Sequence, residues 1–330
     1  MNIQVKDHER IYEINLEQIT QLCGSNFTKK DYLITSLEKF FSNSKYASYE
    51  ERYMDNIVVD NDNAGRKYFE CMVIRCRNDL IGAIKLSKTS IMMKYIKGQI
   101  NNFEYQIELE QIADRLEKIY CNLNNKLLSN ISNIELQYKT EDILSIVSNS
   151  VIYGKEERSI EELSNYELIE TFINLLNELQ NIEPKRMMII IDNIDHLLKY
   201  DEYKIIYRKI DGICNKRDMW FVLSSSIDGY VVIDEEYIKG INIINDIIFN
   251  LPEIEHIHEF IKSNYPCNIE FNNKELYKIL RNIIQYIGNS DYEIKIRSNV
   301  FLKLINESNC IKNRLEDNIN VPEKEFLFYK

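Results

Sequence analysis

The stretch Arg186–Asp195, which reads Arg-Met-Met-Ile-Ile-Ile-Asp-Asn-Ile-Asp, decides the fold class. Five consecutive apolar residues, Met187–Ile191, lead directly into the carboxylate of Asp192. Because polar residues do not alternate with them, we expect a strand that is buried on both faces, as in a parallel sheet covered by helices. An acid at the carboxyl end of such a strand lies where open α/β sheets bind ligands, and in P-loop proteins it helps to hold magnesium. A core strand with a solvated end is the alternative.

Composition bounds the class of protein. The chain has 330 residues, 45% of them hydrophobic, with 9 glycines and 4 prolines, which favours two or three domains rich in long helices. The net charge of −11 is not that of a basic nucleic-acid domain, although basic residues concentrated on one surface could still bind a polyanion. Seven scattered cysteines without a CxxC pair indicate neither zinc nor disulfides. With no signal peptide and no membrane-spanning apolar run, we expect a cytoplasmic protein without a membrane partner.

A second stretch has the order strand, loop and helix that a phosphate-binding loop requires. Residues 18–23 predict a short strand, and apolar residues at helical spacing over 33–41 predict a helix. The P-loop motif needs Gly, four residues, Gly, Lys, and then Ser or Thr. Aligned on Gly24, the second glycine is replaced by Lys29, the lysine is Lys30, and the hydroxyl residue is replaced by Asp31.

Both replacements oppose a working nucleotide site. A side chain at Lys29 obstructs close approach of a phosphate to the backbone. Asp31 puts a negative charge where a hydroxyl group would ligate magnesium beside the phosphates. We therefore predict a degenerate phosphate loop of Gly24, Lys29, Lys30 and Asp31, with Asp192 beside it. An ordinary turn between a strand and a helix is the alternative.

Residues 75–97 reverse the acidic balance of the chain. Six cations stand there against one acid, Asp79, which gives a local net charge of +5. Such a patch can contact DNA phosphates without reading bases, and because Tyr95 is its one aromatic residue we favour the duplex backbone over stacking on single strands. An ordinary solvated surface is the alternative. The predicted DNA-binding residues are Arg75, Arg77, Lys85, Lys88, Lys94 and Lys97.

Helical patterns fill much of the remaining chain. Residues 90–128 predict one helix of roughly 55 Å, too long for one compact domain, and helices at 141–149 and 159–181 would form a hairpin or bundle with it. Further predictions are strands within 3–15, at 56–60, 67–76, 219–223 and 241–249, and helices at 201–215, 253–264, 273–287 and 292–306. We therefore expect an α/β fold: a degenerate P-loop-ATPase-like head with a parallel sheet (1–89 and 185–250), a helical leg insertion (90–184) and an all-helical C-terminal extension (251–330).

Acidic residues gather near predicted turns in the segment 133–142. Glu135, Glu141 and Asp142 could ligate calcium, because carboxylate oxygens near a bend are its usual ligands. Acidic residues are also ordinary at helix N-termini, which is the alternative.

The order of these parts resembles the CRISPR type II-A adaptation proteins, the Csn-two family, in a long form. The resemblance rests on the degenerate loop, the helical insertion and the segments 186–192, 219–223 and 230–244, and it covers residues 1–250. It implies a P-loop-like head without nucleotide hydrolysis, a ring-shaped homotetramer, and calcium as cofactor, for which Glu135, Glu141 and Asp142 match by position. It also implies binding of double-stranded DNA ends through a lysine-lined hole. The protein would assist spacer acquisition beside the integrase proteins and the RNA-guided nuclease of the same system.

Three functions are open at this point. The first is a non-enzymatic ring that binds the ends of double-stranded DNA regardless of sequence. The second is a P-loop NTPase in which Asp192 holds magnesium and Lys30 the phosphates, although Asn193 stands where a catalytic Glu often follows. The third is a protein-binding scaffold built on the legs and the C-terminal extension.

Overall fold

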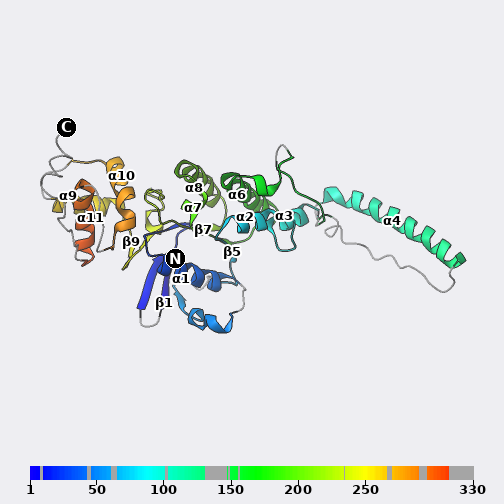
Figure 1. Cartoon of the computed structure of the whole chain (residues 1–330), viewed down its shortest axis with the longest axis horizontal. Helices are drawn as coiled ribbons and strands as arrows, with labels where there is room; N and C mark the ends of the chain where they lie inside the picture. The colour runs from blue at the N-terminus through cyan, green and yellow to red at the C-terminus, as the bar shows by residue number, and fades with distance from the viewer. Residues whose placement is uncertain are drawn as a thin grey trace. The chain divides into compact units, whose positions relative to one another are not determined.

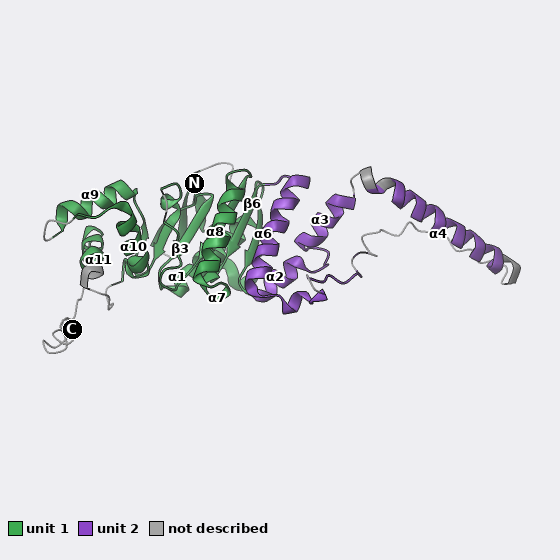
Figure 2. Ribbon diagram, turned by 90° about the horizontal axis from the view of Figure 1, so that it is seen from above, with its two compact units in different colours: residues 1–76, 186–330 green, residues 77–185 purple. Residues whose placement is uncertain are grey.

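The computed structural model describes residues 1–7, 10–42, 46–60, 65–100, 103–130, 147, 149–154, 157–233, 235–265, 270–289 and 296–311. The chain divides into two compact units (Figure 2). Unit 1 contains residues 1–76 and 186–330, and unit 2 contains residues 77–185. The predicted helical insertion therefore falls within unit 2, and the C-terminal extension belongs to unit 1.

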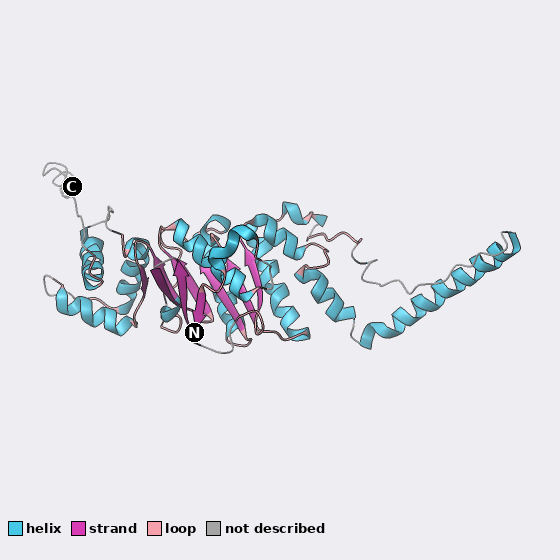
Figure 3. Ribbon diagram, turned by 90° about the horizontal axis from the view of Figure 1, so that it is seen from below, coloured by secondary structure: helices cyan, strands magenta, loops and turns pink. Residues whose placement is uncertain are grey.

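Unit 1 is built on a six-stranded sheet in the order β5-β6-β7-β3-β8-β9. Figure 3 shows the strands in magenta with helices packed around them. The first five strands run parallel, and β9 pairs antiparallel at the edge. Every residue of β6 is at most 1% exposed, as its unbroken apolar run predicted. The strands are β3 (Ile19–Cys23), β5 (Glu70–Ile74), β6 (Met187–Ile191), β7 (Met219–Ser224), β8 (Ile241–Ile244) and β9 (Ile248–Asn250).

The stretch 241–249 differs from its prediction. It forms the antiparallel hairpin β8–β9 instead of one strand. The N–H of Asn245 donates to the carbonyl oxygen of Ile247 at 3.0 Å, which closes the turn. Asn and Asp favour turns, so Asn245-Asp246 was the signal for a break.

Helices cover both faces of this sheet. Leu33 and Leu37 of α1 (Phe27–Phe41) share one buried cluster with Leu22 of β3. Gln21, the neighbour of Leu22, accepts a hydrogen bond of 2.8 Å from the hydroxyl of Tyr203 in α8 (Tyr200–Cys214). Because successive residues of a strand point to opposite faces, α1 and α8 cover opposite sides. The short helix α7 (Ile194–Leu197) follows β6.

A smaller antiparallel sheet and the C-terminal helices complete unit 1. The sheet has the order β2-β1-β4, with β1 (Asn2–Asp7), β2 (Arg10–Asn15) and β4 (Ile57–Val59). The C-terminal helices share a second buried cluster with Cys23 and β8, so the extension packs against the head. The remaining helices of the unit are η1 (Ser48–Tyr53), η4 (Ile238–Gly240), α9 (Ile254–Asn264), α10 (Asn273–Ile283), η5 (Ile284–Tyr286) and α11 (Ile296–Ser308).

Unit 2 is helical in its described part. The helices α2 (Arg77–Ile84) and α3 (Ile91–Ile100) both pack against α6 (Asn165–Ile182), which follows the turn η3 (Ile160–Glu162). The predicted helix 90–128 consists of α3 and the separate 28-residue helix α4 (Phe103–Asn130) (Figure 1). The predicted helix 141–149 lies mostly outside the described residues. Among the described helices, none is both long enough and apolar enough to cross a membrane.

Candidate functional site

The predicted phosphate loop lies at the carboxyl edge of the six-stranded sheet. Gly24 follows β3, Asp192 follows β6 and Ser225 follows β7, and the order β6-β7-β3 of these parallel strands brings the three ends to one edge. Asn26 caps α1 by accepting a hydrogen bond of 3.1 Å from the N–H of Lys29. A loop followed by a helix N-terminus is the geometry that binds phosphate in P-loop proteins.

Protein groups already occupy the backbone donors of this loop. The N–H of Gly24 donates to Oε1 of Gln285 at 2.5 Å, and the N–H of Ser25 donates to Oδ1 of Asn245 at 2.7 Å. In a P-loop, such N–H groups point at phosphate oxygens. A phosphate would therefore have to displace two side-chain carbonyl groups.

The two side chains that fill the loop are themselves fixed. Asn245 uses Nδ2 to donate to the carbonyl oxygens of Gln285 at 2.8 Å and Ile287 at 2.6 Å. Gln285 uses Nε2 to donate to the carbonyl oxygen of Ile227 at 3.2 Å. Gln285 belongs to η5 and is 2% exposed. The C-terminal extension thus closes the phosphate loop from inside the protein.

Gly24 serves this closed packing. It has a φ of +100°, and a Cβ added to it would lie 2.3 Å from the carbonyl oxygen of Ile244 in β8. Glycine adopts that conformation freely, and it alone leaves room for the neighbouring strand. The backbone approach that P-loops make to a ligand is made here to the sheet itself.

Both lysines of the loop bind carbonyl oxygens. Lys29 Nζ donates to the carbonyl oxygens of Asn245 at 2.8 Å and Asp246 at 2.6 Å, and burial lowers its pKa. Lys30 is 2% exposed, and its Nζ donates to the carbonyl oxygen of Ser225 at 2.9 Å and to Oγ of Ser226. Burial lowers the pKa of Lys30 as well, against the raising effect of nearby acidic groups.

Asp31 is directed to another partner. Its carboxylate is 61% exposed and pairs with Arg75 at 2.9 Å, and the same guanidinium group pairs with Glu38 at 2.9 Å. Arg75 also donates to Oγ1 of Thr35 at 3.1 Å, which ties the chain just after β5 to α1. Of the predicted DNA-binding residues, Arg75 is therefore part of the packing of the head.

The acids after β6 hold backbone groups. Asp192 is 8% exposed and its Oδ1 accepts from the N–H of Asn193 at 2.9 Å. Asp195 is 6% exposed, and its Oδ2 accepts from the N–H groups of Ser226 at 2.6 Å and Ile227 at 2.7 Å. Sequence reasoning assigned no role to Asp195, although its place three residues after Asp192, on the first turn of α7, was the available signal. Asp195 orders the chain after β7.

The other predicted DNA-binding residues lie in unit 2. Arg77 donates to Oδ1 of Asn165 at 2.6 Å and to the carbonyl oxygen of Leu163 at 2.5 Å, so it holds the start of α6. Lys85 pairs with Glu161 at 2.6 Å, with 51% and 53% of the two side chains exposed. The exposed residues Lys88 and Lys97 make no ion pair within the described chain, and Lys94 on α3 is half-buried.

Glu135, Glu141 and Asp142 lie outside the described residues. Among the residues that the structure does describe, His, Cys, Asp and Glu side chains form no group of three that could hold a metal ion. Calcium binding by the three acids stays a prediction.

Comparison with solved structures bears on the fold. The crystal structure of Stu0660 of Streptococcus thermophilus matches over 99% of both chains, with a TM-score of 0.89 and 23% identity, which shows the fold alone. The SMC head domain from Thermotoga maritima covers 76% of this chain and 98% of its own, with a TM-score of 0.35 and 11% identity. An SMC head bound to the C-winged helix domain of ScpA covers 78% and 98%, with a TM-score of 0.41 and 13% identity. Both TM-scores are below 0.5, so we draw nothing about this chain from the SMC heads.

Comparison by sequence decides the family. No curated protein matches the chain. The family model described as CRISPR-associated protein Csn2 subfamily St matches residues 3–327, so the match extends through the C-terminal extension that the resemblance left out. The chain therefore belongs to the Csn2 family of CRISPR-associated proteins.

Proposed function

We propose that this protein is a non-enzymatic binder of double-stranded DNA ends that assists CRISPR spacer acquisition. It would act as a homotetramer beside the integrase proteins and the RNA-guided nuclease of its system. Membership of a CRISPR-associated family gives the setting. The closed phosphate loop carries the non-enzymatic part, because Gln285 and Asn245 occupy the donors that a triphosphate needs.

Unit 2 offers cations for the DNA backbone. Lys88 and Lys97 are exposed, and Lys85 pairs with Glu161 only across solvent-exposed side chains. Exposed ion pairs contribute little free energy, so Lys85 can exchange Glu161 for a phosphate. A local positive surface reconciles DNA binding with the net charge of −11, because phosphate contacts require only nearby positive charge.

The surface of α4 supports assembly into a homotetramer. Apolar residues recur at alternating steps of three and four, and Ile112, Ile119 and Leu123 are 45%, 52% and 45% exposed. This heptad has Leu at one core position and Ile at the other, a choice that favours bundles of more than two helices. The stripe consists of Leu109, Ile112, Leu116, Ile119 and Leu123.

A gel shift with linear and circular duplexes of the same sequence tests DNA binding. We expect the linear duplex to bind, with affinity that falls steeply with salt. Replacing four lysines of unit 2 by Ala should reduce the slope of log K against log salt by about 3 to 4, since each phosphate contact contributes about 0.9. The four are Lys85, Lys88, Lys94 and Lys97.

A quadruple variant in unit 1 is the matched control. Lys216, Lys262, Lys274 and Lys278 are exposed, and their replacement by Ala removes the same charge. If both quadruple variants change the slope equally, the specific surface in unit 2 is wrong. If the circular duplex binds as tightly as the linear one, recognition of ends is wrong.

The competing NTPase reading has its own test. If the wild-type protein hydrolyses ATP and Lys30→Ala abolishes this activity, the NTPase hypothesis replaces our proposal. Our expectation is that neither protein hydrolyses ATP, because Lys30 Nζ is committed to Ser225 and Ser226.

Calcium is proposed on the resemblance and on the acidic residues of the segment 133–142. Titration calorimetry should show calcium binding to the wild-type protein and weaker binding to the double variant Glu135→Ala/Asp142→Ala, because carboxylates supply its oxygen ligands. Equal binding by both proteins would move the calcium site elsewhere in the chain.

A further inference from the structure

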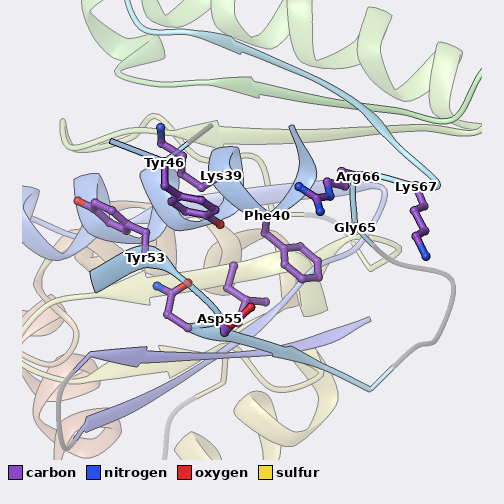
Figure 4. Close-up of a pocket in the computed structure, with 10 residues that line it drawn as sticks. Lys39, Phe40, Tyr46, Tyr53, Asp55, Gly65, Arg66 and Lys67 are labelled. Atoms are coloured by element: carbon purple, nitrogen blue, oxygen red, sulfur yellow. The ribbon is translucent and has the colours of Figure 1, made fainter. Parts of the chain in front are cut away.

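A cavity of about 300 Å³ lies in unit 1 and shares no lining residue with the phosphate loop (Figure 4). Its wall comes from the end of α1, the segment around η1 and the turn at 65–67. None of these segments took part in the sequence predictions of a site. The cavity combines aromatic rings, cations and one buried amide.

Two aromatic rings of the cavity are only half-buried. Phe40, near the end of α1, lies central in the cavity, and Tyr46 lies beside Lys39 (Figure 4). A Cβ added to Gly65 would lie 3.3 Å from the ring of Phe40, so the glycine lets the turn close against that ring. Lys39 Nζ lies over the ring of Tyr46, 5.8 Å from its centre, and Phe40 makes an edge contact with Phe41. A half-buried aromatic ring can stack a flat ligand group, and every nucleobase offers such a group.

Positive charge exceeds negative charge around the cavity. The lining residues include Lys39, Arg66 and Lys67 against the single carboxylate of Asp55, among the residues described there. Lys39 Nζ forms an ion pair with Glu50 Oε2 at 2.8 Å, so its charge is partly neutralised. Lys39 is therefore less able to bind a ligand than Arg66 or Lys67. Arg66 and Lys67 are exposed and make no hydrogen bond or ion pair within the described chain. They are therefore free to bind a phosphate, and arginine does so with paired donors.

A buried amide adds an acceptor. Asn56 lines the cavity and is 6% exposed. Its Nδ2 donates to the hydroxyl of Tyr32 at 3.0 Å and to Oγ of Ser36 at 2.8 Å. These two bonds fix the amide and leave Oδ1 without a partner among the described residues. Because Asn56 lines the cavity, this oxygen is an acceptor that an amino group of a base can reach in place of water.

We propose that this cavity binds one nucleoside monophosphate unit. The base would stack on Phe40 or Tyr46, with its amino group near Asn56, and the phosphate would bind Arg66 and Lys67. The volume is at the lower end of ligand pockets, which suits a single nucleotide rather than a longer strand. The unit is either a free nucleotide or an unpaired nucleotide at the end of a DNA strand, and the second source rests on the proposed function.

Titration calorimetry with deoxyadenosine monophosphate tests the cavity itself. We expect binding to the wild-type protein, and binding about tenfold or more weaker to Arg66→Ala/Lys67→Ala because charge-assisted bonds to the phosphate are lost. Deoxyadenosine and deoxyribose 5-phosphate should each bind more weakly than the whole nucleotide. Phe40→Leu should weaken the nucleotide more than the sugar phosphate, since it removes stacking and retains an apolar side chain.

The matched control is Arg208→Ala/Lys216→Ala. Both residues are exposed in unit 1, lie outside the cavity, and remove the same charge. Equal weakening by the two double variants, or no binding by the folded wild-type protein, would overturn the proposal. Equal affinity for deoxyadenosine and its monophosphate would do the same.

A duplex with one unpaired 5′-phosphorylated nucleotide, compared with its blunt form, separates the two sources. If the wild-type protein binds the overhang duplex more tightly than the blunt one, and Arg66→Ala/Lys67→Ala abolishes this difference, the cavity binds DNA ends. Equal binding of overhang and blunt duplex, together with binding of the free nucleotide, assigns it to the free ligand. If the wild-type protein binds the free nucleotide but neither duplex, the proposed function is wrong and the nucleotide site in the cavity is supported.

Discussion

The lysines of the phosphate loop and the exposed lysines of unit 2, Lys88 before α3 and Lys97 on α3, are the same residue type in opposite situations. Lys30 is 2% exposed and donates to Ser225 and Ser226, so its charge is part of the fold. Lys88 and Lys97 are exposed and pair with no acid in the described chain. Lys30 thus occupies the motif position but is not available to a ligand. Lys88 and Lys97 belong to no motif, yet their charges face solvent.

The largest expected effect breaks the closed side of this comparison. Gly24→Ala should destabilise unit 1 by about 3 kcal/mol or more, because a Cβ there meets backbone of β8 and the φ is left-handed. Thermal unfolding monitored by circular dichroism measures it. Gly212→Ala on α8 is the control, since nothing lies within 4 Å, and it should be neutral or stabilising. Wild-type stability in Gly24→Ala would mean that the loop is open.

The buried charge gives the second effect. Lys30→Met keeps an apolar stem and leaves the oxygens of Ser225 and Ser226 without their donor, so we expect a loss of about 1–3 kcal/mol near neutral pH. The pKa of Lys30 is lowered from 10.5 in the folded protein. Between the lowered value and 10.5 the unfolded chain binds more protons, so wild-type stability rises with pH relative to the variant. Urea unfolding at several alkaline pH values checks the sign, and parallel pH curves would contradict it.

The third effect concerns the residue that fills the loop. Gln285→Ala removes the acceptor of the Gly24 N–H and should destabilise unit 1 by about 1–3 kcal/mol, since a buried donor is left unpaired. Gln4→Ala is the control: its side chain donates to Glu13 at a solvent-exposed site, and the loss should stay within about 0.5 kcal/mol. Equal stability of the two variants would mean that η5 does not close the loop.

The smallest effect separates the two kinds of cation. Arg75→Ala should reduce stability by about 1 kcal/mol and leave DNA affinity unchanged, because Arg75 joins Asp31 and Glu38. Lys97→Ala should leave stability within about 0.5 kcal/mol and lower the salt slope of DNA binding by about 0.9. Urea unfolding and gel shifts on both proteins measure this. The reverse pattern would exchange the roles that we give the two residues.

The sequence predicted the sheet well because its signals are local. The apolar run Met187–Ile191 predicted a strand covered on both faces, and Gly24 indicated a loop before a helix. One departure has a local signal, since Asn245-Asp246 turned a predicted strand into a hairpin. The predicted helices 90–128, 159–181 and 273–287 are each divided into two shorter helical elements.

The candidate site could be predicted only in part, because its decisive contacts join distant residues. The motif indicated that Lys29 and Asp31 were wrong for a phosphate loop. It could not indicate that Gln285 fills the loop, since the partners are 261 residues apart. Likewise Arg75 looked like part of a basic surface until its partners Asp31 and Glu38 on α1 were known. The exposure of a side chain and its ion-pair partners depend on the tertiary fold, so they cannot be predicted by counting charges along the sequence.

The contact between Gly24 and Gln285 also bears on the order of folding. A ribosome adds Gln285 to the chain 261 residues after Gly24. Until Gln285 has been synthesised, the N–H of Gly24 must bind water, so the head completes its native edge only when the C-terminal extension has emerged. A nascent chain arrested before η5 would therefore leave the N–H of Gly24 exposed to solvent, although Asn245 could already accept from Ser25.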